Sequence, residues 1–317
     1  MKKALVTGIA GFAGSHLAEH LLANDFSITG FFHKTHPVSN IDHIKSKISL
    51  IECDITDEDR VKKEIKSLNP DYVFHLAAFS SPAQSFDSPR EALENNIVGQ
   101  LNILEALVKI GSKARTLIIG SADEYGNIDE KYLPADETTP LAPISPYAVS
   151  KVAQDMLGLQ FFLHYKLHIV RVRPFNHIGP RQSTTFAIPS FAAQIAALEK
   201  QGGGTIKVGN LENSRDFTDV RDTVRAYLLA LEQAKTGEVY NIGTGHAVKV
   251  SDILDLMLKL SKIKIKIEVD KSRIPPVDIK TIYCDFSKFK NQTGWQPAIS
   301  LEKTLFDTIE YERSKLN

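Results

Sequence analysis

The first 24 residues constrain the fold of this chain more than any other stretch. Residues 3–7 predict a short buried strand, and an amphipathic helix is expected to end near Asn24. Between them, glycines recur every third residue in the turn Gly8-Ile9-Ala10-Gly11-Phe12-Ala13-Gly14. A strand, a glycine turn and a helix in this order let the backbone approach a pyrophosphate, which the helix N-terminus stabilises. We therefore expect a dinucleotide-binding turn formed by Gly8, Gly11, Phe12, Ala13 and Gly14.

Short strands and helices alternate along the rest of the first half. The pattern predicts strands at 27–32, 48–53, 71–78, 114–121 and 168–173, and helices at 90–110 and 147–163. Such an alternation is typical of an α/β fold with a Rossmann-type, doubly wound parallel sheet, whose ligands lie at the carboxyl edge. The pattern changes after Pro174. We expect a cofactor-binding domain at 1–175, with returning segments near 220–245, and a smaller C-terminal substrate-binding lobe formed by 176–219 and 246–317.

The end of the second expected strand bears on the choice of cofactor. A carboxylate at this place would bind the ribose hydroxyls of NAD, whereas here Phe32 is followed by His33 and Lys34. Because the acid is missing and positive charge is present, a 2′-phosphate is favoured, so NADP(H) is preferred and NAD(H) stays possible. Asp54, after the third strand, could accept a bond from the adenine amine or cap the next helix.

Tyr147 and Lys151 open the helix that follows Pro146, a residue suited to a first helical turn. They are four residues apart and therefore share one helical face. A cation beside a phenol lowers the phenol pKa from its usual ~10, so the pair could act as an acid or base near neutral pH. This spacing alone is common on amphipathic helices. Ser121 and Asp123 add a hydroxyl and a carboxylate at the end of another strand.

The charge balance and the cysteines exclude several classes of protein. Lys+Arg and Asp+Glu each number 38, so no general attraction to nucleic acid or to a membrane surface is expected. Cys53 and Cys284 form neither a disulfide framework nor a metal-ligand pattern, which favours the cytoplasm. His16 and His20, four apart on the first helix, are interpreted as surface histidines, and no metal site is expected.

Taken together, these motifs resemble those of the extended short-chain dehydrogenase/reductases of the nucleotide-sugar branch. The resemblance covers nearly the whole chain and rests on Thr7-Gly8-x-x-Gly11-x-x-Gly14, Asp54-Ile55, His75-Leu76-Ala77-Ala78, Asn96, Ser121, Tyr147-x-x-x-Lys151 and Arg173-Pro174. It implies that Tyr147 exchanges a proton with the substrate, that Ser121 hydrogen-bonds the substrate oxygen and that Lys151 holds the nicotinamide ribose. Asn96 would support this network. Further cofactor contacts are implied for Ile55, Leu76, Ala77, Ala78 and Pro174.

The resemblance also has implications for assembly. The expected helices 90–110 and 147–164 carry broad apolar faces, and in this family such helices commonly pair across a twofold axis. A homodimer is therefore expected.

The second half is similar to that of the GDP-6-deoxy-4-keto-D-mannose reductases. The similarity rests on 173–180, on 209–222 and on Pro276-Val277-Asp278. It implies NAD(P)H-dependent reduction of the C4 ketone of GDP-4-keto-6-deoxy-D-mannose to GDP-D-rhamnose, with substrate contacts from Ser121, Asp123, Asn176, Arg215 and Arg273. An arginine fork suits phosphate oxygens. Arg215 could instead pair with Asp216 or Asp219.

Three alternatives stay open. GDP-mannose 4,6-dehydratases resemble this chain but show Thr-Ser-Glu or Thr-Asp-Glu where it has Ser121-Ala122-Asp123. Ala122 cannot do acid–base work and Asp123 is one methylene shorter than Glu, so reduction is favoured. A nucleotide-sugar epimerase would hold NAD tightly and recycle it. A non-catalytic dinucleotide sensor often lacks the tyrosine or the lysine, and both are present here.

Overall fold

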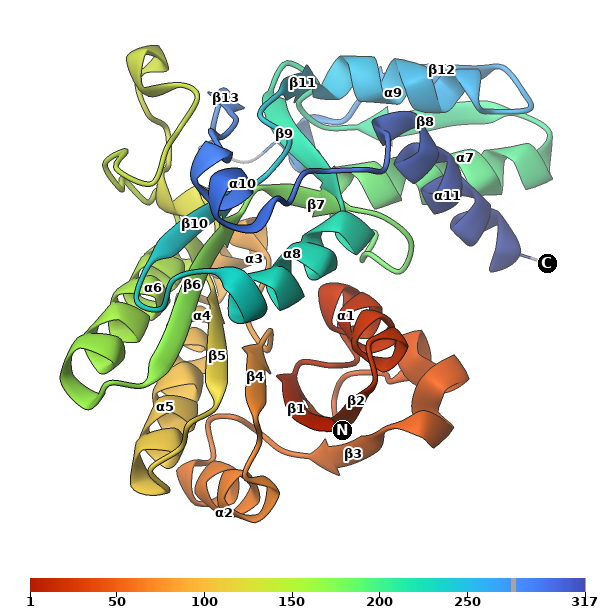
Figure 1. The fold of residues 1–317 in the computed structure, drawn as a ribbon. Coiled ribbons are helices and arrows are strands. Elements are labelled where there is room, and N and C mark those ends of the chain that lie inside the picture. The colour runs from red at the N-terminus through yellow and green to blue at the C-terminus, as the bar shows by residue number, and fades with distance from the viewer. Residues whose placement is uncertain (275–277, 317) are drawn as a thin grey trace.

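The large sheet contains seven strands, all parallel to their neighbours, in the order β10-β6-β5-β4-β1-β2-β3 (Figure 1). The computed structural model describes residues 1–274 and 278–316. The strands are β1 (Lys2–Thr7), β2 (Phe26–Phe32), β3 (Ser49–Glu52), β4 (Tyr72–His75), β5 (Arg115–Ile119), β6 (His168–Pro174) and β10 (Val239–Ile242). This confirms the predicted doubly wound α/β fold.

Helices cover both faces of this sheet, and each face has its own apolar core. On one face, α1 (Phe12–Ala23) and α8 (Val220–Gln233) bury Leu17 and Tyr227 against the strands. The other face is covered by α2 (Glu58–Leu68), α5 (Gly99–Lys109) and α6 (Pro146–Tyr165), which bury Val61, Ile103 and Phe161. The strands are buried on both sides because parallel strands need such cover.

The expected helix 90–110 is in fact three segments. A short α4 (Pro89–Leu93), itself preceded by α3 (Pro82–Asp87), leads into a π-helical turn at Glu94–Val98 and then into α5. The π turn places Asn96 in the interior, where its side chain is fully buried. Such turns often occur at functional sites. Residues 39–47, which none of the expected strands and helices covers, form a 3₁₀ helix.

A second group of elements lies beyond the carboxyl edge of the large sheet (Figure 1). Its helices are α7 (Ala187–Gln201), α9 (Val250–Lys259) and α11 (Leu301–Ser314), which share a core with the parallel pair β8 (Gly204–Val208) and β12 (Ile265–Val269). A small sheet contains β7 (Asn176–Ile178), β9 (Ser214–Asp219), β11 (Ala247–Lys249) and β13 (Thr281–Ile282). The short α10 (Ser287–Thr293) returns to the large sheet, where Phe289 and Trp295 are buried.

Strand β9 was not expected from the sequence, where residues 209–222 served only as part of the similarity to a known family. Asp216, Thr218 and Asp219 of this strand are buried, and both carboxylates accept hydrogen bonds from specific donors. Asp216, fully buried, accepts bonds from the backbone amides of Thr244 and Gly245 at 2.7 and 2.9 Å. A charged residue can therefore occupy an interior strand position because its partners are supplied by tertiary structure.

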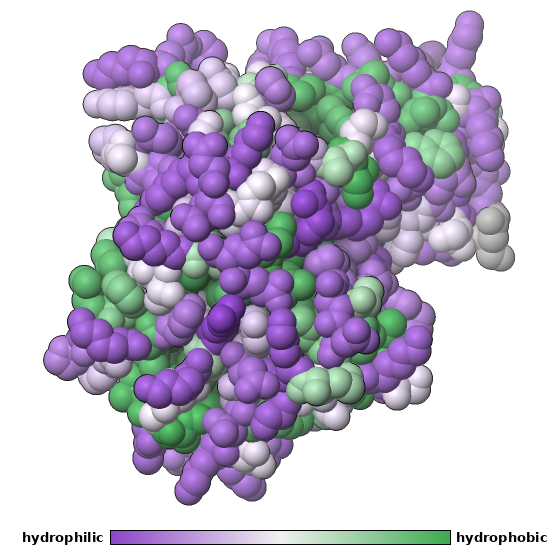
Figure 2. Space-filling view, viewed as in Figure 1, coloured by the Kyte–Doolittle hydropathy of each residue, from purple (hydrophilic) through white to green (hydrophobic). Residues whose placement is uncertain are grey.

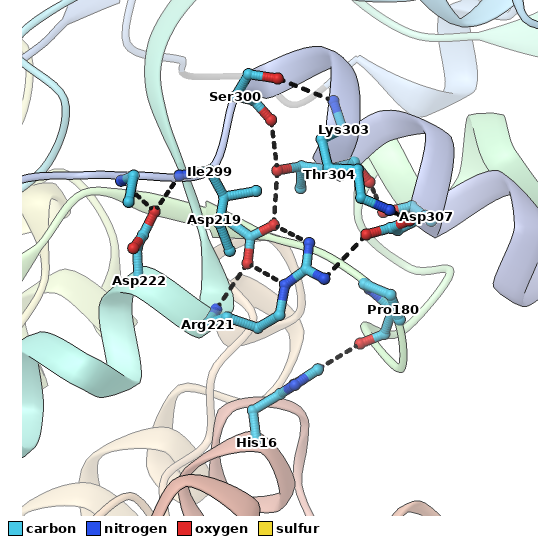
Figure 3. A network of polar contacts seen from close by, with 12 residues as sticks. His16, Pro180, Asp219, Arg221, Asp222, Ile299, Ser300, Lys303, Thr304 and Asp307 are labelled. Atoms are coloured by element: carbon cyan, nitrogen blue, oxygen red, sulfur yellow. Dashed lines mark hydrogen bonds and ion pairs between the residues drawn. The ribbon is translucent and has the colours of Figure 1, made fainter.

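The start of α8 is tied to α11 by a buried polar cluster (Figure 3). The Asp219 carboxylate caps α8 and accepts bonds from Arg221 and, at 2.6 Å, from the Thr304 hydroxyl of α11. Arg221 also contacts Asp307 at 2.9 Å. Asp222 accepts the backbone amide of Ile299 at 2.8 Å. These contacts join the second group of elements to the helix layer of the large sheet.

Candidate active site

The glycine turn has the close backbone contacts that a dinucleotide-binding turn needs. Gly8 has φ +68°, and a Cβ there would lie 2.8 Å from the Ala77 nitrogen. A Cβ on Gly14 would lie 2.2 Å from the Gly8 carbonyl oxygen. Gly11, exposed and without a side chain, caps α1, so the amides of the first turn are available to an anion. Phe12 and Ala13 begin that turn and are half-buried.

A hollow of about 490 Å³ lies where the second and third strands end, lined by His33, Lys34, Glu52, Asp54, Asp57 and Arg60. His33 and Lys34, selected from the sequence, therefore lie beside Asp54, and the His33 ring is 3.7 Å from the Asp54 carboxylate. Arg60 was missed. The sequence could have indicated Arg60, because it lies in the first turn of the helix that Asp57 caps, close to Asp54. Two cationic side chains, one imidazole and three acidic groups together fit a ligand with both a phosphate and an amine.

The residues that follow β4, for which cofactor contacts were implied, are partly accessible. Leu76, Ala77 and Ala78 are half-buried, and the Ala77 amide donates to the Thr7 hydroxyl at 3.1 Å. That hydroxyl also bonds the His75 ring at 2.9 Å. Burial, with a smaller effect of Lys151, lowers the pKa of His75 to about 3, so this ring is neutral at physiological pH. The fold and the chemistry of these residues fit a bound dinucleotide.

Tyr147 and Lys151 face each other near the start of α6. The helix begins there because Ser145 caps it and Pro146 occupies its first position. The Lys151 Nζ lies 5.9 Å from the centroid of the Tyr147 ring and donates to the Ile119 carbonyl at 2.9 Å. Both side chains are buried. The carbonyl bond holds the lysine at the edge where β5 ends.

The pKa of Tyr147 differs from the expectation. Burial and the negative charge of Asp123 raise it well above its usual value, although the Ser121 hydroxyl opposes the shift. Burial lowers the pKa of Lys151 to about 8, and Glu124 opposes this change. The expectation of a lowered phenol pKa is therefore wrong for this chain, because burial and the negative charge of Asp123 raise it. The phenol stays protonated.

Ser121, Asp123 and Arg215 come together beside Tyr147. Ser121 caps the 3₁₀ turn Ala122–Glu124, and its hydroxyl accepts the Asp123 amide at 3.1 Å. Burial raises the pKa of Asp123, while the positive charge of Arg215 opposes it. Arg215 pairs with Asp278 at 2.9 Å, and not with Asp216 or Asp219, the alternative that the sequence left open beside a phosphate contact. Asp278, named in the sequence only as part of a motif and without a role, is therefore a member of this group.

The other sequence-selected residues lie around this group. The Asn96 amide donates to the Ser150 hydroxyl at 2.8 Å, and its carbonyl oxygen accepts the Phe79 amide at 2.7 Å. Ile55 is buried in the core of the large sheet. Pro174 ends β6, and Asn176 begins β7 with its side chain exposed.

Arg273 belongs to a separate turn, where its guanidinium lies 3.5 Å from Asp270 and 3.5 Å from the Ser190 hydroxyl. Part of the motif Pro276-Val277-Asp278 follows closely in the chain, but Pro275, Pro276 and Val277 lie outside the described residues. The structure therefore links Arg273 to α7 and not to Tyr147.

His16 corrects another expectation. It is buried and bonds the Pro180 carbonyl oxygen at 2.9 Å (Figure 3). Arg181 lies against the same ring, and burial lowers the pKa of His16 to about 4. The ring is thus a packing and bonding element between α1 and the 180–181 turn. Among residues 1–274 and 278–316, no three metal-binding side chains cluster.

Comparison with known proteins identifies the family. The sequence profile described as GDP-mannose 4,6 dehydratase matches residues 5–308. The chain belongs to the GDP-mannose 4,6 dehydratase family. Like other members it is an extended short-chain dehydrogenase/reductase and an enzyme of the GDP-sugar dehydratase and reductase group.

Proteins named for two different activities, a reductase and a dehydratase, are similar to the chain. GDP-6-deoxy-D-mannose reductase of Pseudomonas aeruginosa is 33% identical over 96% of this chain and 95% of its own length. GDP-mannose 4,6-dehydratase of Yersinia enterocolitica is 29% identical over 98% and 93%. The solved structure of RMD from Pseudomonas aeruginosa complexed with NADPH superposes with a TM-score of 0.86 at 31% identity, covering 99% of this chain and all of that one.

The family assignment agrees with the resemblance seen in the sequence. In the part of the chain that the structure describes, no helix is long and apolar enough to cross a membrane.

Proposed function

We propose that this enzyme reduces the C4 ketone of GDP-4-keto-6-deoxy-D-mannose to a 4-hydroxyl, forming GDP-D-rhamnose in the cytoplasm. The observation that carries the proposal is the Ser121 turn beside Tyr147, in which Ala122 offers no acid–base group and Asp123 is shorter than glutamate. Reduction needs a proton donor at the carbonyl oxygen, which the neutral phenol supplies. Dehydration also needs a group that assists loss of the C6 hydroxyl, and Ala122 cannot supply one.

Each residue near the ketone has a separate task. Ser121 and Tyr147 donate hydrogen bonds to the substrate oxygen as negative charge develops on it, and Tyr147 then transfers its proton. Lys151 binds the nicotinamide ribose. Asn96 holds α6 in place by hydrogen bonds to the Phe79 amide and the Ser150 hydroxyl. The bound nicotinamide cofactor supplies the hydride. Asp123, Asn176 and Arg215 hold the sugar nucleotide, with Arg273 as a more distant contact.

We assign cofactor binding to one group of elements and sugar-nucleotide binding to the other. Residues 1–175, with the returning segments near 220–245, bind the cofactor through the glycine turn, Asp54, Ile55, residues 76–78 and Pro174. Residues 176–219 and 246–317 bind the nucleotide sugar. The likeness to the Pseudomonas aeruginosa reductase, slightly greater than to the Yersinia enterocolitica dehydratase, supports the choice of substrate.

NADPH is the proposed cofactor, because His33, Lys34 and Arg60 line the hollow at the end of the second strand. Titration by fluorescence should give a lower dissociation constant for NADPH than for NADH. Arg60→Ala should reduce this preference several-fold, whereas Arg90→Ala, which removes an exposed arginine outside that hollow, should leave it unchanged. Equal affinity of the wild type for both cofactors would contradict the assignment.

The reaction itself is tested with two substrates. With GDP-4-keto-6-deoxymannose, the enzyme should oxidise NADPH stoichiometrically and form a 4-hydroxy product. With GDP-mannose alone it should do little, because position 122 is an alanine and Asp123 is shorter than glutamate. Rapid formation of the keto sugar from GDP-mannose without net NADPH consumption would instead establish the dehydratase. If the enzyme reduces a UDP- or dTDP-linked keto sugar but not the GDP-linked one, the reductase assignment holds and the assignment of GDP as the nucleotide is wrong.

A further inference from the structure

The buried carboxylate of Glu124 contacts the backbone of Ser121, and the proposed mechanism does not use it. Glu124 is 0% exposed. Its Oε1 accepts the backbone amide of Ser121 at 2.8 Å, and its Oε2 accepts the Nε of Arg173 at 3.0 Å. A Cβ on Gly120 would lie 2.1 Å from the same Oε1, so glycine is needed to leave room for this carboxylate. The side chain is therefore confined to one position.

Arg173 continues the contacts to the helix that carries the catalytic pair. Its Nε and Nη2 donate to the Asp155 Oδ2 at 2.9 and 2.6 Å. Asp155 follows Lys151 by four residues and Tyr147 by eight, so all three lie on one face of α6. The turn that holds Ser121 is thus joined to α6 by a buried chain of charged hydrogen bonds.

We propose that Glu124 is a positioning residue of the active site, which sets the distance between Ser121 and Tyr147 by joining the Ser121 turn to α6 through Arg173 and Asp155. The inference rests on the proposed function, in which both hydroxyls hold the same substrate oxygen. A displacement of about 1 Å in such an arrangement can reduce the rate roughly 100-fold. The direct bond to the Ser121 amide distinguishes Glu124 from an ion pair that only stabilises the fold.

The same carboxylate acts on Lys151 through its charge. The groups that face Lys151 are Tyr147 on α6, Glu124 on the 3₁₀ turn, His75 on β4 and His177 on β7. Burial lowers the pKa of both histidines, so neither adds positive charge near neutral pH. Burial and Asp155 raise the pKa of Glu124, while Arg173 opposes them, so its negative charge is fullest on the alkaline side, where Lys151 loses its proton. Removal of this carboxylate should therefore make Lys151 lose its proton at lower pH.

Three variants test the proposal. Glu124→Ala removes both contacts, whereas Glu124→Gln keeps the volume and one acceptor for the Ser121 amide. Glu137→Gln is the matched control, because Glu137 is also a largely buried carboxyl that accepts a backbone amide, from Asn241 of β10 at 2.7 Å. At saturating NADPH and keto sugar, we expect kcat to fall roughly 100-fold in Glu124→Ala and about tenfold in Glu124→Gln. The NADPH affinity of all three variants at pH 7, and the kcat of Glu137→Gln, should stay within about threefold of wild type.

A second measurement separates positioning from a merely structural role. The alkaline limb of the kcat profile should move to lower pH in Glu124→Gln and stay in place in Glu137→Gln. If Glu124→Ala does not fold, the isosteric Glu124→Gln decides. Wild-type kcat per folded molecule together with an unmoved alkaline limb in Glu124→Gln would overturn the proposal.

The test can also be made without substrate. Lys151 is proposed to hold the cofactor ribose, so NADPH affinity should weaken as Lys151 loses its proton. The midpoint of this loss should lie at lower pH in Glu124→Gln than in wild type, and an identical midpoint would contradict the inference. If the wild type does not reduce the keto sugar, the proposed function fails, while this binding profile still tests Glu124.

Discussion

At the scale of single residues, burial governs the chemistry of the site more than sequence spacing does. Tyr147 and Lys151 are four residues apart, as a reactive pair requires, yet their pKa values move in opposite directions because each charged form is disfavoured in the interior. The result is a neutral phenol beside a lysine that titrates near neutral pH. A proton donor is thereby kept ready at the place where an oxyanion forms.

Removal of the phenol oxygen should isolate the proton-transfer step. Tyr147→Phe should lower kcat by roughly 10²- to 10⁴-fold, because general acid catalysis is lost. NADPH affinity should stay near wild type, since Lys151 is intact. Tyr240→Phe is the control. It removes the hydroxyl of a buried tyrosine of β10, which accepts the backbone amide of Lys235, and it should leave kcat unchanged. Near-normal turnover in Tyr147→Phe would refute the mechanism.

The pH dependence should report Lys151. Its pKa in the folded chain is about 8, below the usual 10.5. Activity should therefore decline on the alkaline side with a midpoint near pH 8, as the charged form is lost. Lys151→Arg, which stays protonated, should move this decline to higher pH. The same limb in both enzymes would show that another group titrates.

The lysine affects stability in the opposite direction. Between pH 8 and 10.5 the unfolded chain binds more protons at Lys151 than the folded chain does. The contribution of Lys151 to the free energy of unfolding therefore rises with pH through this window. Activity should fall while this contribution increases, which distinguishes loss of the charged lysine from simple alkaline unfolding.

At the scale of elements, buried carboxylates hold together segments that are far apart in the sequence. Asp219 caps α8 and receives the Thr304 hydroxyl of α11, and Asp222 receives amides from the chain that leads into α11 (Figure 3). These contacts determine where the C-terminal helix lies against the start of α8. Because the carboxylates are buried, each lost donor has an appreciable energetic effect.

Thr304→Val should measure this link. The change keeps the shape of the side chain but removes the donor to the buried Asp219, so the free energy of unfolding should fall by about 1–3 kcal/mol. Lys303→Ala, one residue away, breaks the exposed pair with Asp307 and should change it by no more than about 1 kcal/mol. Chemical denaturation followed by circular dichroism gives both values. An equal effect of the two changes would show that the buried bond is not the stronger one.

At the scale of the whole molecule, one exposed apolar surface is left on α6. Val149, Met156, Leu163 and Tyr165 are each at least 39% exposed. Met156, Leu159, Gln160, Leu163 and His164 line a shallow hollow there. Figure 2 shows apolar side chains gathered along the edge of the molecule where Figure 1 places α6. Contiguous patches of this kind are commonly interaction sites.

We expect this α6 surface to pair two copies of the chain into a homodimer. Light scattering at micromolar concentration should give twice the mass of the 317-residue chain. Leu163→Asp should shift the mass to that of a monomer, because it places a charge in the apolar contact. Val269→Asp, at a position on β12 that is 55% exposed, should leave the dimer intact. A monomeric wild type would refute the prediction.

The sequence alone determined the large sheet and the residues gathered at its edge. Glycine spacing, apolar periodicity and strand ends are local properties, and parallel strands bring their carboxyl ends to one edge, so Gly8, Ser121 and Tyr147 could be assigned to the same region. Charged partners could not be assigned in this way. The pairing of Arg215 with Asp278, the burial of His16 and the shifted pKa of Tyr147 all depend on which distant segments exclude water around a group. That exclusion is decided only when the chain has folded.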